Sequence, residues 1–437
     1  MPAPYALAVT RAWRALEGPA VDSVIAVEDE WSAQGAWGCA CYNPPTQTMN
    51  HQIYLDYAAT TPVDERVFEA MQPYFSIAYG NPSSIHAYGQ RAERAVDAAR
   101  EVVAGVLGCS PDEIIFTSCG TESDNLALRG AAYAGRERTG ARRILTTQAE
   151  HHAVSRTSQQ LEAQHGFAVS WLELDEHGGV RPDTVKKAVS GDVILVSVMY
   201  GNNEIGTINP ISEIAEVCRA EGVLLHTDAV QAAAYLPLDV RKLGVDLMSL
   251  GGHKFHAPKG VGALYVRRGT RLLPSQTGGS QEFGLRAGTQ NVPLIVGFAK
   301  ALELVDQERE QRVRHAKAWR DHIIGSLLEQ VPDSRLTGDP ENRLPNHASF
   351  AFKHVDGNLL LVLLDGAGFA CSSGSACKTG DPEPSDVLTS IGLPREWGLG
   401  SLRVTVGRAT SAAEVEAFLS ALPPLVEKAR ALKQVKS

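Results

Sequence analysis

The sequence predicts an α/β protein with a large domain built on a mostly parallel sheet and a smaller α+β domain. From residue 66 to residue 297, strand-like apolar runs alternate with helical patterns, as expected when helices connect parallel strands. The pattern then changes to one long charged helix followed by shorter strands and helices. A chain of 437 residues is also longer than one hydrophobic core usually supports, so two domains are expected.

The elements of the large domain follow in order along the chain. The continuous apolar run 193–199 is typical of a strand that is covered on both faces. Gly135 and Gly222 lie just beyond helical patterns and are expected to end those helices. The predicted helices are 91–107, 122–133 and 212–221, and the predicted strands are 114–117, 143–147, 193–199, 223–227, 245–250 and 262–266.

The smaller domain begins with a helix predicted at 298–331, which would connect the two domains. Strands are predicted at 348–352 and 402–406, and helices at 358–364 and 411–422; Ser411 and Glu414 form a capping-box pattern. We expect residues 66–300 to form the large domain, and residues 49–65 with 301–437 to form the small one. Residues 1–48 are expected to be a weakly ordered extension or a start-site artefact, because a run typical of a protein start follows Met49.

Composition excludes several classes of function. The net charge of −9 argues against nucleic acid or an anionic membrane as the main partner. The apolar runs are too short to span a bilayer, and the first residues lack the pattern of a secretory signal. Seven cysteines in so long a chain, with no CxxC pair, predict free thiols in a reducing compartment and no structural zinc site. A cytoplasmic location is therefore expected.

Polar side chains follow the predicted strands at the sheet edge where ligands bind in open α/β folds. Gly120 and Thr121 open a helix after one strand, so its free backbone N–H groups could hold a phosphate. His151, Asn203 and Asp228 follow three further strands. The ordinary alternative for Gly120 and Thr121 is a simple capped helix, and that for His151 is a polar loop. An aspartate at a buried strand end needs a cationic partner, such as a pyridinium nitrogen.

Lys254 follows the next strand, in the run Gly252-His253-Lys254. Alone, it fits either a surface lysine in a hairpin or a Schiff-base lysine whose amine is partly deprotonated. Five consecutive strand ends that offer a phosphate cradle, a stacking group, an amide, an acid and a lysine favour the second interpretation. Together they predict a site for pyridoxal 5′-phosphate (PLP).

Two features of the smaller domain extend this site. Cys377 lies in a loop of small residues beside Lys378, which is typical of a reactive thiol, although an incidental surface thiol is the alternative. Arg403 lies within a predicted strand and needs an anionic partner. That partner is either an amino-acid carboxylate or a structural acid.

From about residue 53 onward the chain resembles the cysteine desulfurases of the NifS/IscS type, within the class V aminotransferases. The resemblance rests on nine motifs, and the cysteine-bearing loop separates desulfurases from other class V enzymes. The motifs are YLDYAATTP (54–62), GNPSS (80–84), TESDN (121–125), EH (150–151), NNE (202–204), DAVQ (228–231), GHK (252–254), RAGT (286–289) and SSGSAC (372–377).

The resemblance implies PLP fold type I, with a mostly parallel seven-stranded-type sheet in the large domain, and a role for each matching residue. Lys254 would bind PLP as a Schiff base, Gly120 and Thr121 would hold its phosphate with His253 nearby, and His151 would stack on its ring. Asp228 would contact the ring nitrogen, and Asn203 and Gln231 the hydroxyl side. Thr289 would reach the phosphate of the other subunit of a homodimer. The family often has a serine that contacts the phosphate at the position of Gly251, so a backbone N–H or another hydroxyl would have to make that contact here.

The implied activity is that of a cysteine desulfurase, a PLP-dependent sulfurtransferase. Arg403 and Asn203 would hold the carboxylate of L-cysteine, Lys254 would remove its Cα proton, and Cys377 would take the sulfur as a persulfide, leaving L-alanine. The sulfur would supply iron–sulfur cluster assembly or another thio-cofactor through a scaffold or acceptor protein, with Cys377 as a transient cluster ligand and no dedicated metal site. The alternatives are a selenocysteine lyase, another class V aminotransferase, or a sulfur-relay protein with a vestigial site.

Overall fold

The computed structural model describes residues 52–373 and 383–436, and the fold is that of these residues. They belong to one compact unit, Asn50–Ser437. The predicted extension 1–48 and the predicted nucleophile Cys377 lie outside the described residues. In the part of the chain that is described, no helix combines the length and the apolar character that crossing a membrane would require.

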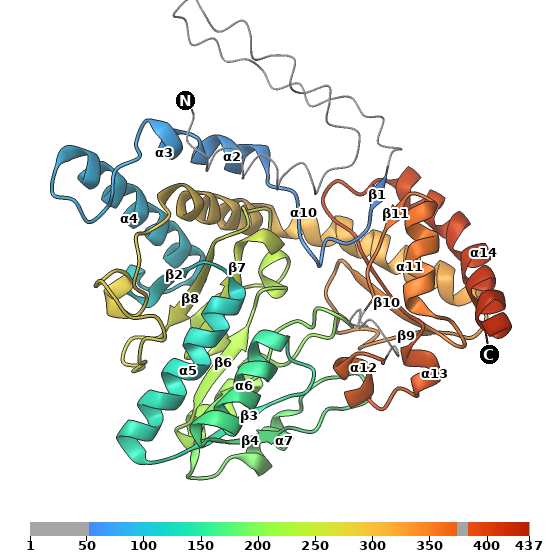
Figure 1. The fold of residues 1–437 in the computed structure, drawn as a ribbon, viewed down its shortest axis with the longest axis horizontal. Coiled ribbons are helices and arrows are strands. Elements are labelled where there is room, and N and C mark those ends of the chain that lie inside the picture. Colours follow the sequence, from blue (N-terminus) through green and yellow to red (C-terminus); the bar gives the residue numbers. More distant parts are fainter. Residues whose placement is uncertain (1–51, 374–382, 437) are drawn as a thin grey trace, which may run out of the picture. The chain divides into compact units, whose positions relative to one another are not determined.

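A seven-stranded sheet forms the centre of the large part of the unit (Figure 1). Strand β8 is antiparallel to both of its neighbours, and every other neighbouring pair is parallel, so the prediction of a mostly parallel sheet is confirmed. In spatial order the strands are β2 (Ile114–Thr117), β8 (Gly262–Val266), β7 (Leu247–Gly251), β6 (Leu224–Asp228), β5 (Val193–Ser197), β3 (Arg143–Thr146) and β4 (Ala168–Trp171).

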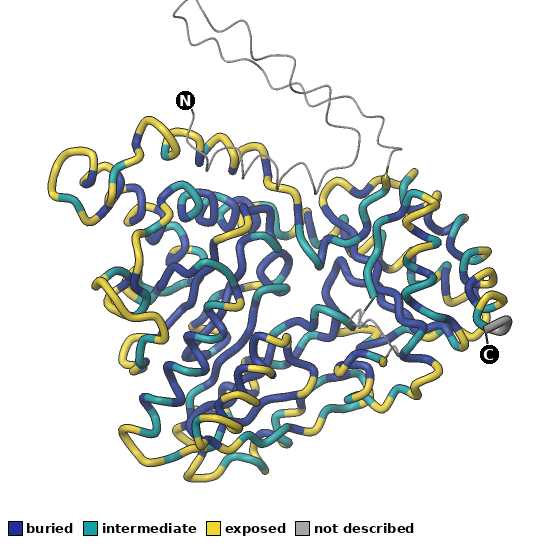
Figure 2. Tube along the Cα trace, in the orientation of Figure 1, coloured by how far each residue is buried: buried dark blue, intermediate teal, exposed yellow. Residues whose placement is uncertain are grey.

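Helices cover both faces of this sheet. The side chains on the two faces of its strands therefore belong to two separate hydrophobic cores. Ile114 and Phe116 of β2 pack into one core with α4, while Ile115 between them packs into the other with α5. The inner strands are accordingly buried along their length (Figure 2). The helices of this part are α2 (Glu65–Met71), α3 (Pro73–Ser76), α4 (Ala87–Leu107), α5 (Gly120–Thr139), α6 (His152–His165), α7 (Pro182–Ala188), α8 (Ile211–Glu221) and α9 (Val240–Leu243).

The long helix α10 (Val292–Gln330) packs against α4, which covers one face of the large sheet, and against α14 of the C-terminal region. That region holds an antiparallel sheet in the order β12 (Ser401–Thr405), β10 (His347–Phe352), β9 (Ser334–Leu336). The strand β1 (Ile53–Tyr54) pairs in parallel with β11 (Phe369–Ala370), which brings the start of the described chain to this region. The remaining helices are α11 (Gly357–Gly366), α12 (Asp386–Ser390), α13 (Arg395–Gly398) and α14 (Ala412–Lys436).

Several predicted boundaries are wrong. The helix α5 runs past Gly135 and ends at Gly140, which has a φ of 75°. A Cβ on Gly135 would lie 2.4 Å from Cγ2 of Ile194, so this glycine permits close helix–strand packing and does not end the helix. The helix α10 begins six residues earlier than predicted, at Val292, and α14 continues through Pro423 and Pro424.

Candidate active site

The carboxyl ends of the parallel strands open into a cavity of about 360 Å³. Its lining comes from the strand ends of the large sheet, from the segment after β1, and from β12. Nine of the predicted site residues line it together: Gly120, Thr121, His151, Asn203, Asp228, Gln231, His253, Lys254 and Arg403. Thr289 is exposed and does not line the cavity.

Lys254 is held at the cavity by main-chain oxygens. It ends a short 3-10 helix, Gly252–Lys254, directly after β7. Its Nζ donates hydrogen bonds to the carbonyl of Ala58 at 2.8 Å and to that of Ala59 at 2.7 Å. Burial, with a smaller effect from the Arg403 guanidinium, lowers the pKa of Lys254 to about 8. A substantial fraction of this amine is therefore neutral and nucleophilic near neutral pH.

We expect the reactivity of the Lys254 amine to rise steeply with pH. Because its pKa is lowered to about 8, it loses its proton as the pH rises through that value. The neutral fraction, and with it the acylation rate in apoprotein, should rise roughly tenfold between pH 7 and pH 9 and then level off. Mass spectrometry of Lys254 after a short exposure to an amine-directed reagent measures this, with the exposed Lys259 as internal control. A rate that is still rising tenfold per pH unit at pH 9 would contradict the lowered pKa.

The N-terminus of α5 forms an anion cradle at one end of the cavity. Its N-cap residue, Cys119, makes no side-chain capping hydrogen bond, so the first backbone N–H groups remain available beside Gly120 and Thr121. A Cβ on Gly120 would lie 2.6 Å from Cγ2 of Val230. A Cβ on Gly251 would lie 3.3 Å from the Gly120 nitrogen. Gly251, where the related family often has serine, thus lets β7 approach the helix terminus closely.

Replacing Gly120 by alanine should weaken anion binding at this helix terminus. The added methyl group would displace either Val230 or the first turn of α5, because their separation leaves no space for it. We expect cofactor affinity to fall by about tenfold or more, which corresponds to about 1.4 kcal/mol. Fluorescence titration of apoprotein with PLP measures the loss. Gly105→Ala is the matched control, since nothing lies within 4 Å of its added Cβ. Equal affinities of the two variants would contradict this expectation.

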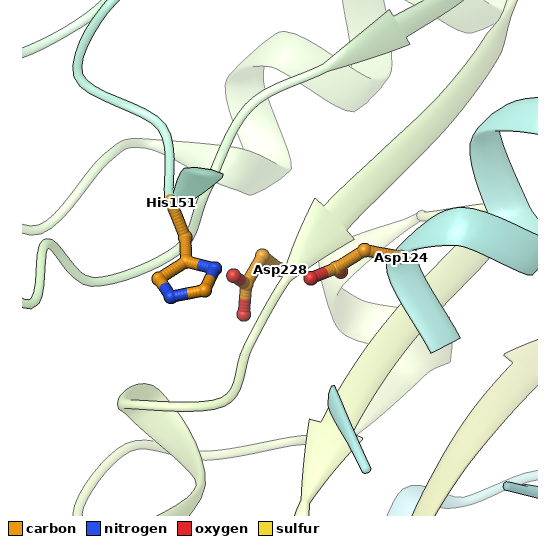
Figure 3. Close-up of side chains that lie close together, drawn as sticks. All are labelled: Asp124, His151 and Asp228. Carbon is orange, nitrogen blue, oxygen red and sulfur yellow. The ribbon is translucent and has the colours of Figure 1, made fainter. Parts of the chain in front are cut away.

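Asp228 and His151 lie side by side at the cavity floor (Figure 3). Asp228 ends β6, and its Oδ1 accepts a hydrogen bond from the Val230 N–H at 2.9 Å. Burial raises the pKa of Asp228, and the charges of His151 and Lys254 oppose that rise. His151 caps α6 by accepting the Ala153 N–H at its Nδ1, 3.1 Å away. Its ring stays exposed to the cavity, yet the surrounding protein lowers its pKa by desolvation.

Arg403 reaches the cavity from β12 with its guanidinium already anchored. Nη1 donates to the backbone oxygen of Asn203 at 2.8 Å, and Nη2 donates to Oδ1 of Asp56 at 2.9 Å. Its Nε is buried without a hydrogen-bond partner. Asp56 also accepts from the hydroxyl of Ser372 at 3.0 Å, in the segment that leads towards Cys377. The structural acid predicted for Arg403 is therefore present as Asp56, and the binding of a ligand carboxylate by Arg403 stays a prediction.

Two further predicted residues are tied to the segment after β1. Gln231 donates from Nε2 to the Ala58 carbonyl at 2.8 Å, and Nδ1 of His253 lies 3.1 Å from the hydroxyl of Thr60. Burial lowers the pKa of His253 to about 4, so this imidazole is neutral at physiological pH. The carbonyl of Ala58 therefore links Lys254 and Gln231.

The cavity also contains residues that the sequence did not identify: Asp124, Met199 and the paired alanines Ala58 and Ala59. Asp124 lies four residues after Gly120 in α5, on the same face of the helix, and this spacing could have revealed it. The alanines act through their carbonyl groups, for which a sequence carries no signal.

Comparisons with known proteins agree with this geometry. A family model described as aminotransferase class-V matches residues 53–418. A cysteine desulfurase IscS of Methanosarcina thermophila is 46% identical over 390 residues, which cover 89% of this chain and 96% of that protein. Among solved structures, a NifS-like protein superposes with a TM-score of 0.80 at 38% identity, covering 86% of this chain and all of the other. The structure of SspA in complex with cysteine has a TM-score of 0.71 at 34% identity and covers 82% and 99%. The chain therefore belongs to the class V aminotransferase family and, within it, to the cysteine desulfurases.

Proposed function

We propose that this protein uses PLP to take the sulfur of L-cysteine onto Cys377, releasing L-alanine. The observation that carries the proposal is a single cavity that combines Lys254, Asp228, Arg403 and the open N-terminus of α5. An amine with a lowered pKa, a buried acid, a carboxylate-binding fork and a phosphate cradle are the groups that an amino-acid reaction on PLP requires.

The described residues fit this cofactor. The N-terminus of α5 would hold the phosphate, because its N–H groups lack a side-chain cap and Gly120 leaves no side chain in the way. Lys254 would attach the cofactor through its amine, and Asp228 would hold a proton on the ring nitrogen. His151, exposed to the cavity beside Asp228, would stack on the ring. When bound, PLP supplies an electron sink for the negative charge that develops at the substrate Cα.

The residues of the chain perform the remaining steps. Arg403 binds the substrate carboxylate through its guanidinium, whose plane is fixed by the Asn203 carbonyl and the Asp56 carboxylate. Lys254 removes the Cα proton. The Cys377 thiolate attacks the substrate sulfur, so that an S–S bond forms and the carbon–sulfur bond breaks. The electron pair of that bond stays on the carbon skeleton, which is protonated to L-alanine.

A direct assay tests the function. Purified holoenzyme with L-cysteine and a thiol reductant should give L-alanine and sulfide in equal amounts. Without the reductant, one persulfide per chain should accumulate and be detectable by mass spectrometry. Alanine without sulfur transfer, or selenide release from L-selenocysteine with no reaction of L-cysteine, would contradict the proposal.

The proposal includes a homodimer, whose partner would supply the exposed Thr289 to complete the phosphate site. A group of large apolar side chains on α2, α3, the segment between α3 and α4, and the start of α4 supports it, because monomers rarely expose so many. The group, which we call the 68–88 surface, consists of Phe68, Phe75, Ile77, Tyr79, Ile85 and Tyr88, with exposed fractions from 53% to 92%.

Ile85→Glu should convert the dimer to a monomer. Ile85 is 92% exposed, so a charge there costs little in the single chain but would be buried in a dimer interface. We expect the dissociation constant of the dimer to rise by at least about 100-fold, measured by analytical ultracentrifugation. Val362→Glu on α11 is the control, since Val362 is 69% exposed and lies outside the 68–88 surface. An Ile85 variant that stays dimeric would place the interface elsewhere.

Two further elements complete the proposal. Residues 66–300 would act as the cofactor-binding domain, while residues 49–65 with 301–437 would act as the domain that carries Cys377. The persulfide would pass to an iron–sulfur scaffold or another acceptor protein. Sulfur transfer from loaded holoenzyme to candidate acceptors, followed by isotope label, tests this step.

A further inference from the structure

Three carboxyl groups are buried together beneath the cavity: Asp124, Glu150 and Asp228, with exposed fractions of 1%, 3% and 4%. One side-chain oxygen of Asp124, one of Asp228 and a ring nitrogen of His151 lie within 4.8 Å of one another. Figure 3 shows the Asp228 carboxylate between the His151 ring and the Asp124 side chain, which reaches it from α5. Asp124 and Asp228 cannot both carry a negative charge at this separation in a water-poor site, and Glu150 adds to the repulsion, so at least one of the three groups carries a proton.

The surroundings of Asp124 favour its neutral form. The groups that face it are the acids Asp228, Glu150 and Cys119, and the Ser249 hydroxyl. Its Oδ1 has no hydrogen-bond partner and lies 3.6 Å from Nε2 of His226. Burial and the Asp228 charge raise the pKa of Asp124 well above its ordinary value.

His226 does not supply a positive charge to Asp124. The imidazole is completely buried between two hydroxyl groups, with Nδ1 2.8 Å from Ser197 Oγ and Nε2 2.9 Å from Ser249 Oγ. Burial lowers its pKa to about 3, so it is neutral. The chain Ser197–His226–Ser249 is therefore an uncharged, hydrogen-bonded support behind Asp124.

The groups around Asp228 favour its ionised form, in contrast to those around Asp124. His151 and Lys254 both stabilise its ionised form, and the Val230 N–H donates to it. Glu150 accepts a hydrogen bond from the Met199 N–H at 2.8 Å, but burial raises its pKa to about 8. Of the three carboxyl groups, Asp228 is thus the one that faces the Lys254 ammonium and the His151 imidazole.

We propose that Asp124 is a positioning residue that acts as a neutral carboxylic acid behind Asp228, so that Asp228 is the buried anion that faces the cavity. An ionised Asp124 would repel the charge on Asp228 and favour its protonation, and a protonated Asp228 could not hold a proton on the ring nitrogen of the cofactor. Burial and the neighbouring Asp228 charge keep Asp124 uncharged, and the chain Ser197–His226–Ser249 behind it supplies no cation that would offset them. The catalytic meaning of this inference rests on the proposed function, but the protonation state is measurable without turnover.

Infrared difference spectroscopy of the holoenzyme tests the assignment. Above pH 9, where Glu150 with its pKa raised to about 8 is mostly ionised, the carbonyl band of a protonated carboxylic acid should be present in the wild type, persist in Asp228→Asn, and disappear in Asp124→Asn. Retention of every such band in Asp124→Asn, or loss of the band in Asp228→Asn alone, would overturn the proposal. Neither result depends on desulfurase activity, so failure of this inference is distinct from failure of the proposed function.

A second measurement covers the case in which Asp124→Asn does not fold. Glu150 should ionise as the pH rises through about 8, so a protonated-acid band that survives above pH 9 in both the wild type and Glu150→Gln belongs to Asp124. Absence of a surviving band would overturn the proposal. Where Asp124→Asn folds, the pH midpoint of the cofactor's visible absorbance should stay within about 0.3 pH unit of the wild type, because one neutral group replaces another. A midpoint lowered by about one unit or more would show that Asp124 had been charged.

Discussion

Replacing Lys254 by alanine is expected to abolish desulfuration of L-cysteine and covalent retention of PLP. Lys254 is the lysine that lines the cavity among the described residues, and its pKa is lowered to about 8. In the proposed function Lys254 binds the cofactor covalently and transfers the Cα proton, and no neighbouring side chain could replace both roles. Proton transfer by a positioned group alone contributes about 10²–10⁴-fold in rate, so turnover should fall by at least about 10³-fold.

The measurements are sulfide release and visible absorbance after gel filtration. The variant should fold, because removal of the side chain relieves a buried cation and leaves two carbonyl groups at the wall of a cavity that water can enter. Lys259→Ala is the matched control, since Lys259 lies in the same loop and is exposed. A Lys254 variant that kept the cofactor after reduction with borohydride would show that another amine carries it.

Replacing Cys377 by alanine is expected to separate cofactor binding from sulfur transfer. The variant should bind PLP and change its spectrum with L-cysteine, while sulfide release falls to the background rate. Three other cysteines are poor candidates for the nucleophile, because burial raises the pKa of Cys109 and Cys218 to about 12 and that of Cys371 above its ordinary value.

Chain geometry makes the assignment to Cys377 physically reasonable. Ser372 is tied to Arg403 by two backbone hydrogen bonds, of 2.7 and 3.3 Å, so the segment before Cys377 starts beside the cavity wall. Cys377 follows Ser372 by five residues, and five residues can span at most about 17 Å, so the nucleophile cannot lie farther than that from Ser372. Cys109→Ser is the matched control and should retain activity. Cys119 also lines the cavity, so loss of persulfide in Cys119→Ala but not in Cys377→Ala would move the nucleophile to that position.

The regular parts of the fold follow from local patterns in the sequence. The runs 114–117 and 262–266 are strands with those bounds, because their apolar residues fill cores on both sides of the sheet. The edge strand β4 (Ala168–Trp171) went unpredicted, since its residues are exposed or half-buried and give no apolar run. The true end of α5 was missed because Gly135 packs against Ile194, a residue nearly 60 positions away that local patterns do not reveal.

The candidate site was predictable to the extent that it lies at strand ends. Lys254 and Asp228 follow from the rule that parallel strands present their carboxyl ends at one edge of a sheet. The ion pair between Arg403 and Asp56 was not predictable in this way, because it joins positions 347 residues apart. Asp124 was missed because an aspartate within a helix usually faces water; its spacing of four residues from Gly120 was the available signal, and the structure shows that it lies close to Asp228.

The two carbonyl groups that hold the Lys254 amine have a consequence for mutational tolerance. Both acceptors belong to the main chain, at Ala58 and Ala59, so no single side-chain replacement removes them. The backbone there is fixed by the bond from the Ala58 N–H to the Thr405 hydroxyl, 2.9 Å long, and by that from the Thr61 N–H to the His253 carbonyl, 2.9 Å long. A lysine released from the cofactor would find this resting position in every variant that preserves the local backbone. Substitutions at positions 58 and 59 should therefore be limited by the space that the new side chain takes up in the cavity, and not by its polar groups.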